Sequence, residues 1–148
     1  MGDKKGCVLI QFPGKITLEY YNQVEQILRR LNEIDGHNSW RRTMEFRSPT
    51  WYVSETNDLL AEYGASIVLH DIPRSGNLQI NKTAPFVYFR FHGPAGNYRD
   101  SYTKDFLQEQ SARIQGLLKS GKDVYAYLNN TMGSAFENAM TLKAMARL

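Results

Sequence analysis

Residues 86–92 constrain the fold of this chain more than any other segment, because they alternate between two chemically different faces. One face is wholly apolar and consists of Val87, Phe89 and Phe91. The other face carries Tyr88, Arg90 and His92. A strand that is buried on both faces normally reads as a continuous hydrophobic run, so the charge and the imidazole near the carboxyl end need an explanation. Since ligands bind at that end of parallel strands in α/β folds, the segment predicts a strand that ends at a ligand site.

Four other segments have the same form, each short, mostly apolar and polar toward its end: residues 8–12, 43–47, 66–71 and 124–129. Helical patterns lie between most of them, over residues 18–34, 54–64 and 103–121, and from Ser134 onward. In the first of these, the expected apolar stripe consists of Tyr20, Val24, Ile27, Leu31 and Ile34. The order β-α-β-α-β-loop-β-α-β-α predicts an α/β fold with about five parallel strands, helices on the outer face and right-handed crossovers, similar to part of a TIM barrel.

Length and composition agree with a single domain over residues 1–148. A closed eight-stranded barrel needs roughly 250 residues, so five βα units form only part of one. The single Cys7 excludes an intrachain disulfide and matches no metal-binding spacing. No long apolar run or signal-like segment is present, which predicts a cytoplasmic protein without a membrane partner. The net charge of +3 comes from scattered residues rather than a basic tract, so nucleic-acid binding stays open but is not indicated.

Several motifs in order along the chain carry a resemblance to a known family. They are residues 9–13 (LIQFP), Glu45-Phe46-Arg47 with Trp51, residues 86–93 with Tyr98 and Tyr102, and residues 125–130 followed by Gly133, Ala135, Asn138 and Ala139. Together they resemble the YecE-like family, a domain of unknown function, over nearly the whole chain. The resemblance implies a TIM-barrel fold.

The same resemblance implies that this chain corresponds to the carboxyl-terminal part of such a protein. Members of the family begin with roughly three further βα units, including a Gly-rich first strand that is absent here. The chain also departs from the family at Thr131, where the family's asparagine pair is usually followed by an aspartate. The role of that carboxylate is therefore in doubt here.

The residues themselves predict which side chains face away from the helices. Matching the strand phases places seven side chains on the interior side: Gln11, Glu45, Arg47, Arg90, His92, Tyr127 and Asn129. His70 and Asp71 have opposite phase, so we expect only one of them to point inward. Carboxyl ends of parallel strands in a barrel converge on a common cleft, the usual place for catalytic groups.

From this convergence we predict Glu45 and His92 as catalytic residues. The predicted substrate-binding residues are Gln11, Arg47, Trp51, Asp71, Arg90, Tyr98, Tyr127, Asn129 and Asn130. A structural interpretation stands beside each assignment. Glu45 and Arg47 are two apart on one strand face and would also pair with each other, or with Arg90 and Asp71, in a buried structural ion network, because buried charges must be paired. His92 alone would be a core histidine, and Trp51 fits packing as well as stacking on a sugar or base.

Three classes of function follow from these residues. The first is an enzyme that acts on a small polar, sugar-like or phosphorylated substrate, with Glu45 and His92 exchanging protons and Arg47 and Arg90 binding an anion. In a metal variant of this enzyme the ligands would be Glu45, His92 and either Asp71 or His70. The second class is a non-catalytic module that binds small anions in the same cleft. The third is nucleic-acid processing, with Trp51, Tyr98 and Tyr102 as stacking platforms.

Two glycine-containing loops are weak candidates for anion binding. One is residues 92–97, and the other is Gly133-Ser134 at the start of the last helix. No Walker or dinucleotide motif accompanies them, so the sequence names no cofactor.

An open set of five βα units would leave residues 8–12 and 124–129 as edge strands. Its interior face would expose Leu9, Tyr88, Tyr125 and Tyr127. We expect a homodimer to cover these surfaces, the alternative being an amino-terminal barrel segment from a missing region or another polypeptide.

Overall fold

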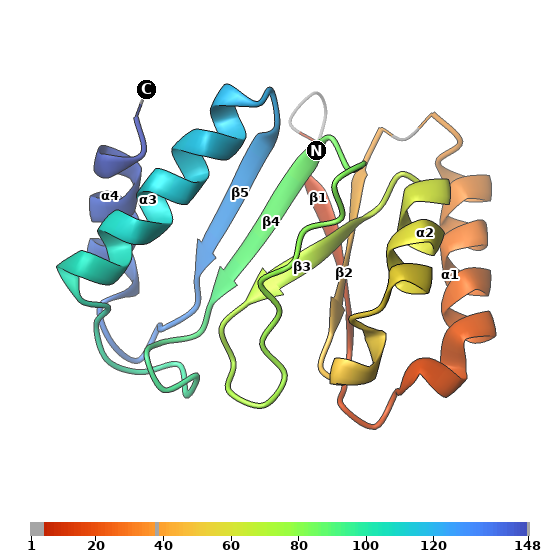
Figure 1. Cartoon of the computed structure of the whole chain (residues 1–148), viewed down its shortest axis with the longest axis horizontal. Coiled ribbons are helices and arrows are strands. Elements are labelled where there is room, and N and C mark those ends of the chain that lie inside the picture. The colour runs from red at the N-terminus through yellow and green to blue at the C-terminus, as the bar shows by residue number, and fades with distance from the viewer. Residues whose placement is uncertain (1–4, 38, 148) are drawn as a thin grey trace. The chain divides into compact units, whose positions relative to one another are not determined.

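Five parallel strands alternate with four α-helices in the chain, for which we obtained a computed structural model that describes residues 5–37 and 39–147 (Figure 1). The strands are β1 (Cys7–Phe12), β2 (Arg41–Phe46), β3 (Ser66–His70), β4 (Phe86–Phe91) and β5 (Asp123–Leu128). The helices are α1 (Tyr21–Ile34), α2 (Ser54–Glu62), α3 (Lys104–Lys119) and α4 (Ala135–Met145), with 3-10 turns η1 (Leu18–Tyr20) and η2 (Pro49–Trp51). Their sheet order, β1-β2-β3-β4-β5, follows the chain, which confirms the predicted α/β class.

The chain divides into two compact units, which are described separately. The amino-terminal unit comprises Met1–Val68 and Gln79–Ala84, and the carboxyl-terminal unit comprises Leu69–Leu78 and Pro85–Leu148. Among the described residues, no helix is both long and apolar enough to cross a bilayer.

In the amino-terminal unit, β1 pairs with β2 in parallel, so that Gln11 lies opposite Glu45 and Phe12 opposite Phe46. One face of these strands packs against α1 and α2, which stand on the same side of them in Figure 1. The core on this face contains Phe12, Val24, Leu28, Met44, Phe46, Trp51, Leu59, Leu60 and Ile67. The alternation of β2 therefore puts Glu45 on the side away from the helices, as predicted.

The apolar stripe of α1 is not the predicted one. Val24 and Leu28 are buried, whereas Ile27 and Ile34 are exposed, Ile34 by 83%. At 3.6 residues per turn the predicted residues do share one stripe, but the buried face is rotated toward Leu28, so Val24 at one edge of the stripe is buried and Ile27 and Ile34 at the other edge are exposed. The buried face is set by the spacing of four from Val24 to Leu28.

Arg42 shows that one of the scattered arginines is structural. Its side chain is buried, and its guanidinium donates to the Asp35 carbonyl at 2.7 Å and to the Leu31 carbonyl at 3.3 Å. These carbonyls lie at the end of α1, where the last turn leaves acceptors without helical partners. Arg42 therefore closes the carboxyl end of α1 and does not present its charge to a ligand.

In the carboxyl-terminal unit, β4 and β5 pair in parallel from Phe86↔Asp123 to Phe91↔Leu128. Val87, Phe89 and Phe91 are buried, and the ring of Phe91 meets Phe106 of α3 edge to face. α3 and α4 contact each other and β5 (Figure 1). The Thr103 side chain accepts from the Phe106 amide and caps α3, as the sequence indicated. The apolar face of residues 86–92 is thus the helix-facing one.

The opposite face of this strand pair carries tyrosines. Tyr88 stacks on Tyr127 with ring centroids 4.8 Å apart and on Tyr125 at 6.3 Å. Arg90 lies opposite Tyr127 in the register. The predicted division of β4 into an apolar face and a face with Tyr88 and Arg90 is confirmed.

Candidate functional site

A buried histidine at the end of β4 is held by an aspartate from the end of β3. The His92 side chain is fully buried, and its Nδ1 lies 3.2 Å from Asp71 Oδ1. The His92 backbone amide donates to the same oxygen at 2.8 Å. Since a carboxylate is only an acceptor, the proton between the two side chains belongs on Nδ1. The neutral ring then carries its lone pair on Nε2.

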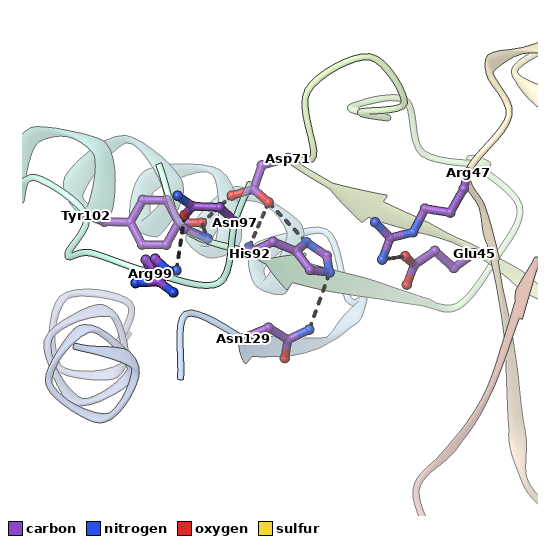
Figure 2. A network of polar contacts seen from close by, with 9 residues as sticks. Glu45, Arg47, Asp71, His92, Asn97, Arg99, Tyr102 and Asn129 are labelled. Carbon is purple, nitrogen blue, oxygen red and sulfur yellow. Dashed lines mark hydrogen bonds and ion pairs between the residues drawn. The ribbon is translucent and has the colours of Figure 1, made fainter. Parts of the chain in front are cut away.

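Tyr102 holds the second oxygen of this carboxylate. Its hydroxyl donates to Asp71 Oδ2 and accepts from the Gly93 backbone amide at 2.6 Å. Figure 2 shows Asp71 between the imidazole and the phenol. Burial raises the pKa of Asp71, but the hydrogen bonds from His92 and Tyr102 outweigh it and leave the pKa below its usual value. Burial and the neighbouring Asp71 raise the pKa of Tyr102, so the phenol stays protonated and donates.

His70 and Asp71 both contact His92, and the expectation that only one of them points inward stays a prediction. β3 ends at His70, so Asp71 lies in the following loop, where strand alternation no longer sets side-chain direction. The ring of His70 is buried and meets the His92 ring edge to face at 6.0 Å. The end of β3 therefore supplies two neighbours of the imidazole.

Arg90 and Asn129 lie beside the other side of the ring. Asn129 Nδ2 lies 3.4 Å from His92 Nε2. With its amide turned, Asn129 Oδ1 accepts from Arg90 Nη2 at 2.8 Å and from Nε at 3.0 Å. The two orientations exclude each other: the first places a donor beside the lone pair of His92 Nε2, and the second gives the Arg90 guanidinium an acceptor. The structure thus brings together four predicted site residues, Asp71, Arg90, His92 and Asn129.

Two buried asparagines, Asn130 after β5 and Asn138 in α4, form hydrogen bonds with the loop that follows β4. Asn130 Nδ2 donates to the Asp100 carbonyl at 2.8 Å and to Asn138 Oδ1 at 2.9 Å. Asn138 Oδ1 also accepts from the Tyr102 amide at 3.1 Å. The amide nitrogen of Asn130 braces the segment that positions Tyr102, and the substrate-binding role of Asn130 stays a prediction.

The weak prediction of anion-binding glycine loops is not supported, because their amides are already used. Gly93 donates to Tyr102 and Gly96 to the Gly93 carbonyl. Gly133 donates to the Asn130 carbonyl, and Ser134 to the Asp100 carbonyl. No free cluster of N–H groups is left at these four positions for a phosphate.

Glu45 and Arg47 form an ion pair within the amino-terminal unit (Figure 2). The Glu45 side chain is fully buried and that of Arg47 is 13% exposed. This is the pairing that the structural interpretation anticipated. The two residues and the Asp71–His92 network belong to different units, so the predicted convergence of Glu45 with His92 stays a prediction.

The remaining predicted binding residues differ in exposure. Trp51 is fully buried, its indole N–H donates to the Ile16 carbonyl at 2.8 Å, and its ring stacks on Phe46 at 4.3 Å. The structure therefore gives Trp51 the packing role that the sequence left open. Gln11 is exposed and Tyr127 is 44% exposed. The rings of Tyr98 and His92 meet edge to face, with their centroids 5.3 Å apart.

Tyr102 and Asn138 are the functional residues that the site prediction missed. Tyr102 was considered only as a stacking platform, and it is 6% exposed. Its place directly before the capping Thr103 indicated a residue at a helix start, but no sequence pattern showed that its hydroxyl reaches Asp71. Among residues 5–37 and 39–147, no group of three or more His, Cys, Asp or Glu side chains is placed to hold a metal ion.

The sequence profile described as "Protein of unknown function DUF72" matches residues 1–148. The chain belongs to the DUF72 family. A search of curated proteins gave no match.

Two DUF72 proteins of known structure are similar to this DUF72 chain. A family member from Thermotoga maritima shares 27% identity with a TM-score of 0.72, covering 93% of this chain and 56% of the other. One from Enterococcus faecalis shares 23% identity with a TM-score of 0.77, covering 96% of this chain and 61% of the other. A second structure from Enterococcus faecalis matches at 20% identity with a TM-score of 0.73 over 96% of this chain and 58% of its own. The DUF72 chain therefore spans less than two thirds of the length of these relatives.

Replacing Asp71 by Asn should destabilise the DUF72 chain in a pH-dependent way. The folded-state pKa of Asp71 lies below its unfolded value of about 3.9. The ionised carboxylate therefore stabilises the fold fully at pH values above the unfolded pKa, and this stabilisation is lost as the pH falls through the folded-state pKa. At pH 7 we expect a loss of about 1–3 kcal/mol of unfolding free energy for Asp71→Asn, shrinking on acidification. Urea unfolding at a series of pH values measures this, with exposed Asp58→Asn as the matched control. An Asp71→Asn deficit that does not change with pH would contradict the assignment.

Proposed function

We propose that this DUF72 chain is an enzyme that uses His92 as a general base or acid on a small polar substrate, sugar-like or phosphorylated. The observation that carries the proposal is the contact of His92 Nδ1 with the Asp71 carboxylate, which fixes the ring and directs the lone pair to Nε2. An imidazole oriented by a carboxylate accepts a proton at Nε2, and the carboxylate stabilises the imidazolium that results. Tyr102 acts through Asp71 and is a positioning residue.

Arg90 and Asn129 give this base its substrate preference. The guanidinium supplies a positive charge with forked donors, and the Asn129 amide beside Nε2 presents either its nitrogen or its oxygen, according to its orientation. Such groups suit a substrate with hydroxyl and anionic groups. Because the loop amides are engaged, the charge of Arg90 carries the preference for an anion.

The alternative classes have less support from the contacts of the site. Nucleic-acid processing relied on Trp51, Tyr98 and Tyr102 as platforms, and two of these are buried. A binding module that uses Arg90 and Asn129 without turnover needs no oriented histidine. The proposal does not depend on Glu45, whose expected role as the proton-transfer partner of His92 we retain as a separate expectation.

We also propose that the chain corresponds to the carboxyl-terminal part of a YecE-like barrel and associates as a homodimer. For the first part, the chain covers 56% and 61% of two solved relatives, which supports its being part of a longer barrel. For the second, Phe136 and Met140 of α4 are 73% and 52% exposed and lie four residues apart on one face of the helix. We keep the cytoplasm as the expected location.

The enzyme proposal is tested by turnover of a panel of p-nitrophenyl glycosides, p-nitrophenyl esters and sugar phosphates. On any substrate that the wild type turns over, His92→Gln and Asp71→Asn should lower the rate by about a hundredfold or more, the usual contribution of general acid–base catalysis. The exposed His37→Gln is the matched control and should leave the rate unchanged. If phosphate shifts the NMR signals of Arg90 but no substrate on the panel is turned over, the binding-module interpretation replaces the proposal.

The assembly proposal is tested by light scattering at micromolar concentration, which should give twice the chain mass. The double variant Phe136→Lys and Met140→Lys places two charges on the exposed face of α4. It should be monomeric, because an apolar interface cannot bury unpaired charges. Ile34→Lys on α1 is the control, since Ile34 is equally accessible but lies on another helix. A cooperatively folded wild-type monomer would overturn the homodimer.

A further inference from the structure

The carboxyl-terminal unit has a pocket on the helix-facing side of β4, and its lining includes His70 and Asp71, which contact His92. Its volume is about 410 Å³, and it lies between α3 and the segment that follows β3. Leu69, Phe89, Phe91 and Phe106 form its apolar wall. No helix follows β3 before β4, so this part of the outer face is not covered by one. The volume falls in the range of small-molecule sites, about 300–1,000 Å³.

Gln110 of α3 is a polar residue at an apolar position of this wall. It follows Leu107 by three residues and precedes Ile114 by four, and both of these are buried. Gln110 is 8% exposed and lines the pocket. A polar group that enters the pocket would find a hydrogen-bond partner in its amide.

Arg113 lies three residues further along the same helix and also lines the pocket. Its Nη2 donates to the Leu78 carbonyl at 2.5 Å, and its Cζ lies 5.3 Å from the centroid of the Phe89 ring. It forms no ion pair among the described residues. Burial lowers the pKa of Arg113, opposed by nearby Glu109, but a guanidinium stays charged in a protein. Its Nη1 and Nε remain as donors for an acid.

We propose that this pocket binds a small carboxylate with an aromatic body. The carboxylate would pair with Arg113, the amide of Gln110 would bond a polar atom of the ligand, and the aromatic body would lie against Phe89, Phe91 and Phe106. A planar guanidinium matches a carboxylate in charge and shape. The lining also contains Arg74, Asp71 and Glu109. The second charge of a phosphate dianion would add repulsion from the two acidic side chains, which favours a singly charged ligand.

The test is an NMR titration with phenylacetate and with uncharged phenylacetamide as its isostere. Phenylacetate should cause saturable shifts of the Gln110 side-chain amide and the Arg113 Nε–H, and it should bind about tenfold tighter than phenylacetamide or more, because only the acid pairs with Arg113. Arg113→Gln should remove this preference, and Arg113→Lys should retain part of it. Equal binding of the two probes, or no shift of these signals at millimolar phenylacetate, would overturn the proposal.

A pair of isosteric variants on α3 locates the site. Gln110→Glu places a negative charge in the pocket and should weaken phenylacetate binding by about tenfold or more. Gln108→Glu makes the same change of charge at an exposed position of the helix and should bind phenylacetate as the wild type does. Equal weakening by both variants would show that binding depends only on net charge and would contradict the pocket. If Gln110→Glu does not fold, the Arg113 variants decide the question.

Discussion

The Asp71 carboxylate holds the candidate site together. It accepts from the His92 backbone amide and imidazole on one oxygen and from the Tyr102 hydroxyl on the other. These donors come from the end of β4 and the start of α3, while Asp71 itself follows β3. One half-buried group therefore fixes the relative positions of three segments, and hydrogen bonds to an ionised group are stronger than those between neutral groups. The orientation of His92 depends on this carboxylate.

The loop that carries Tyr102 needs an unusual backbone to reach Asp71. Gly93 has a φ of 98°, and a Cβ there would lie 2.4 Å from the Arg99 carbonyl oxygen, so only glycine fits. Tyr98 and Asp100 also have positive φ values, 65° and 64°, which non-glycine residues adopt at a cost of about 1–3 kcal/mol each. The Asn130–Asn138 brace offsets that cost by holding the Asp100 carbonyl and the Tyr102 amide. Strain and brace together favour a functional interpretation of this loop.

The period of the strands predicted the fold class and the division of β4 into two faces, because alternation in a strand is fixed by its geometry. It also predicted that Arg90, His92 and Asn129 share a region, since β4 and β5 end together. The sequence did not predict contacts made by residues outside the strands, where alternation does not set the direction of a side chain. Asp71 lies one residue beyond β3, and Tyr102 reaches it across a loop, which no periodicity describes. The stripe of α1 was wrong because large apolar residues occupy more than one face of that helix.

The proposed role of Nε2 as the base requires that Asp71 sets the tautomer of His92. Long-range proton–nitrogen NMR of the neutral His92 imidazole shows which ring nitrogen carries the proton. We expect the proton on Nδ1 and the lone pair on Nε2, and Asp71→Asn should weaken this preference. A neutral ring with its proton on Nε2 would show that Asp71 does not orient the base.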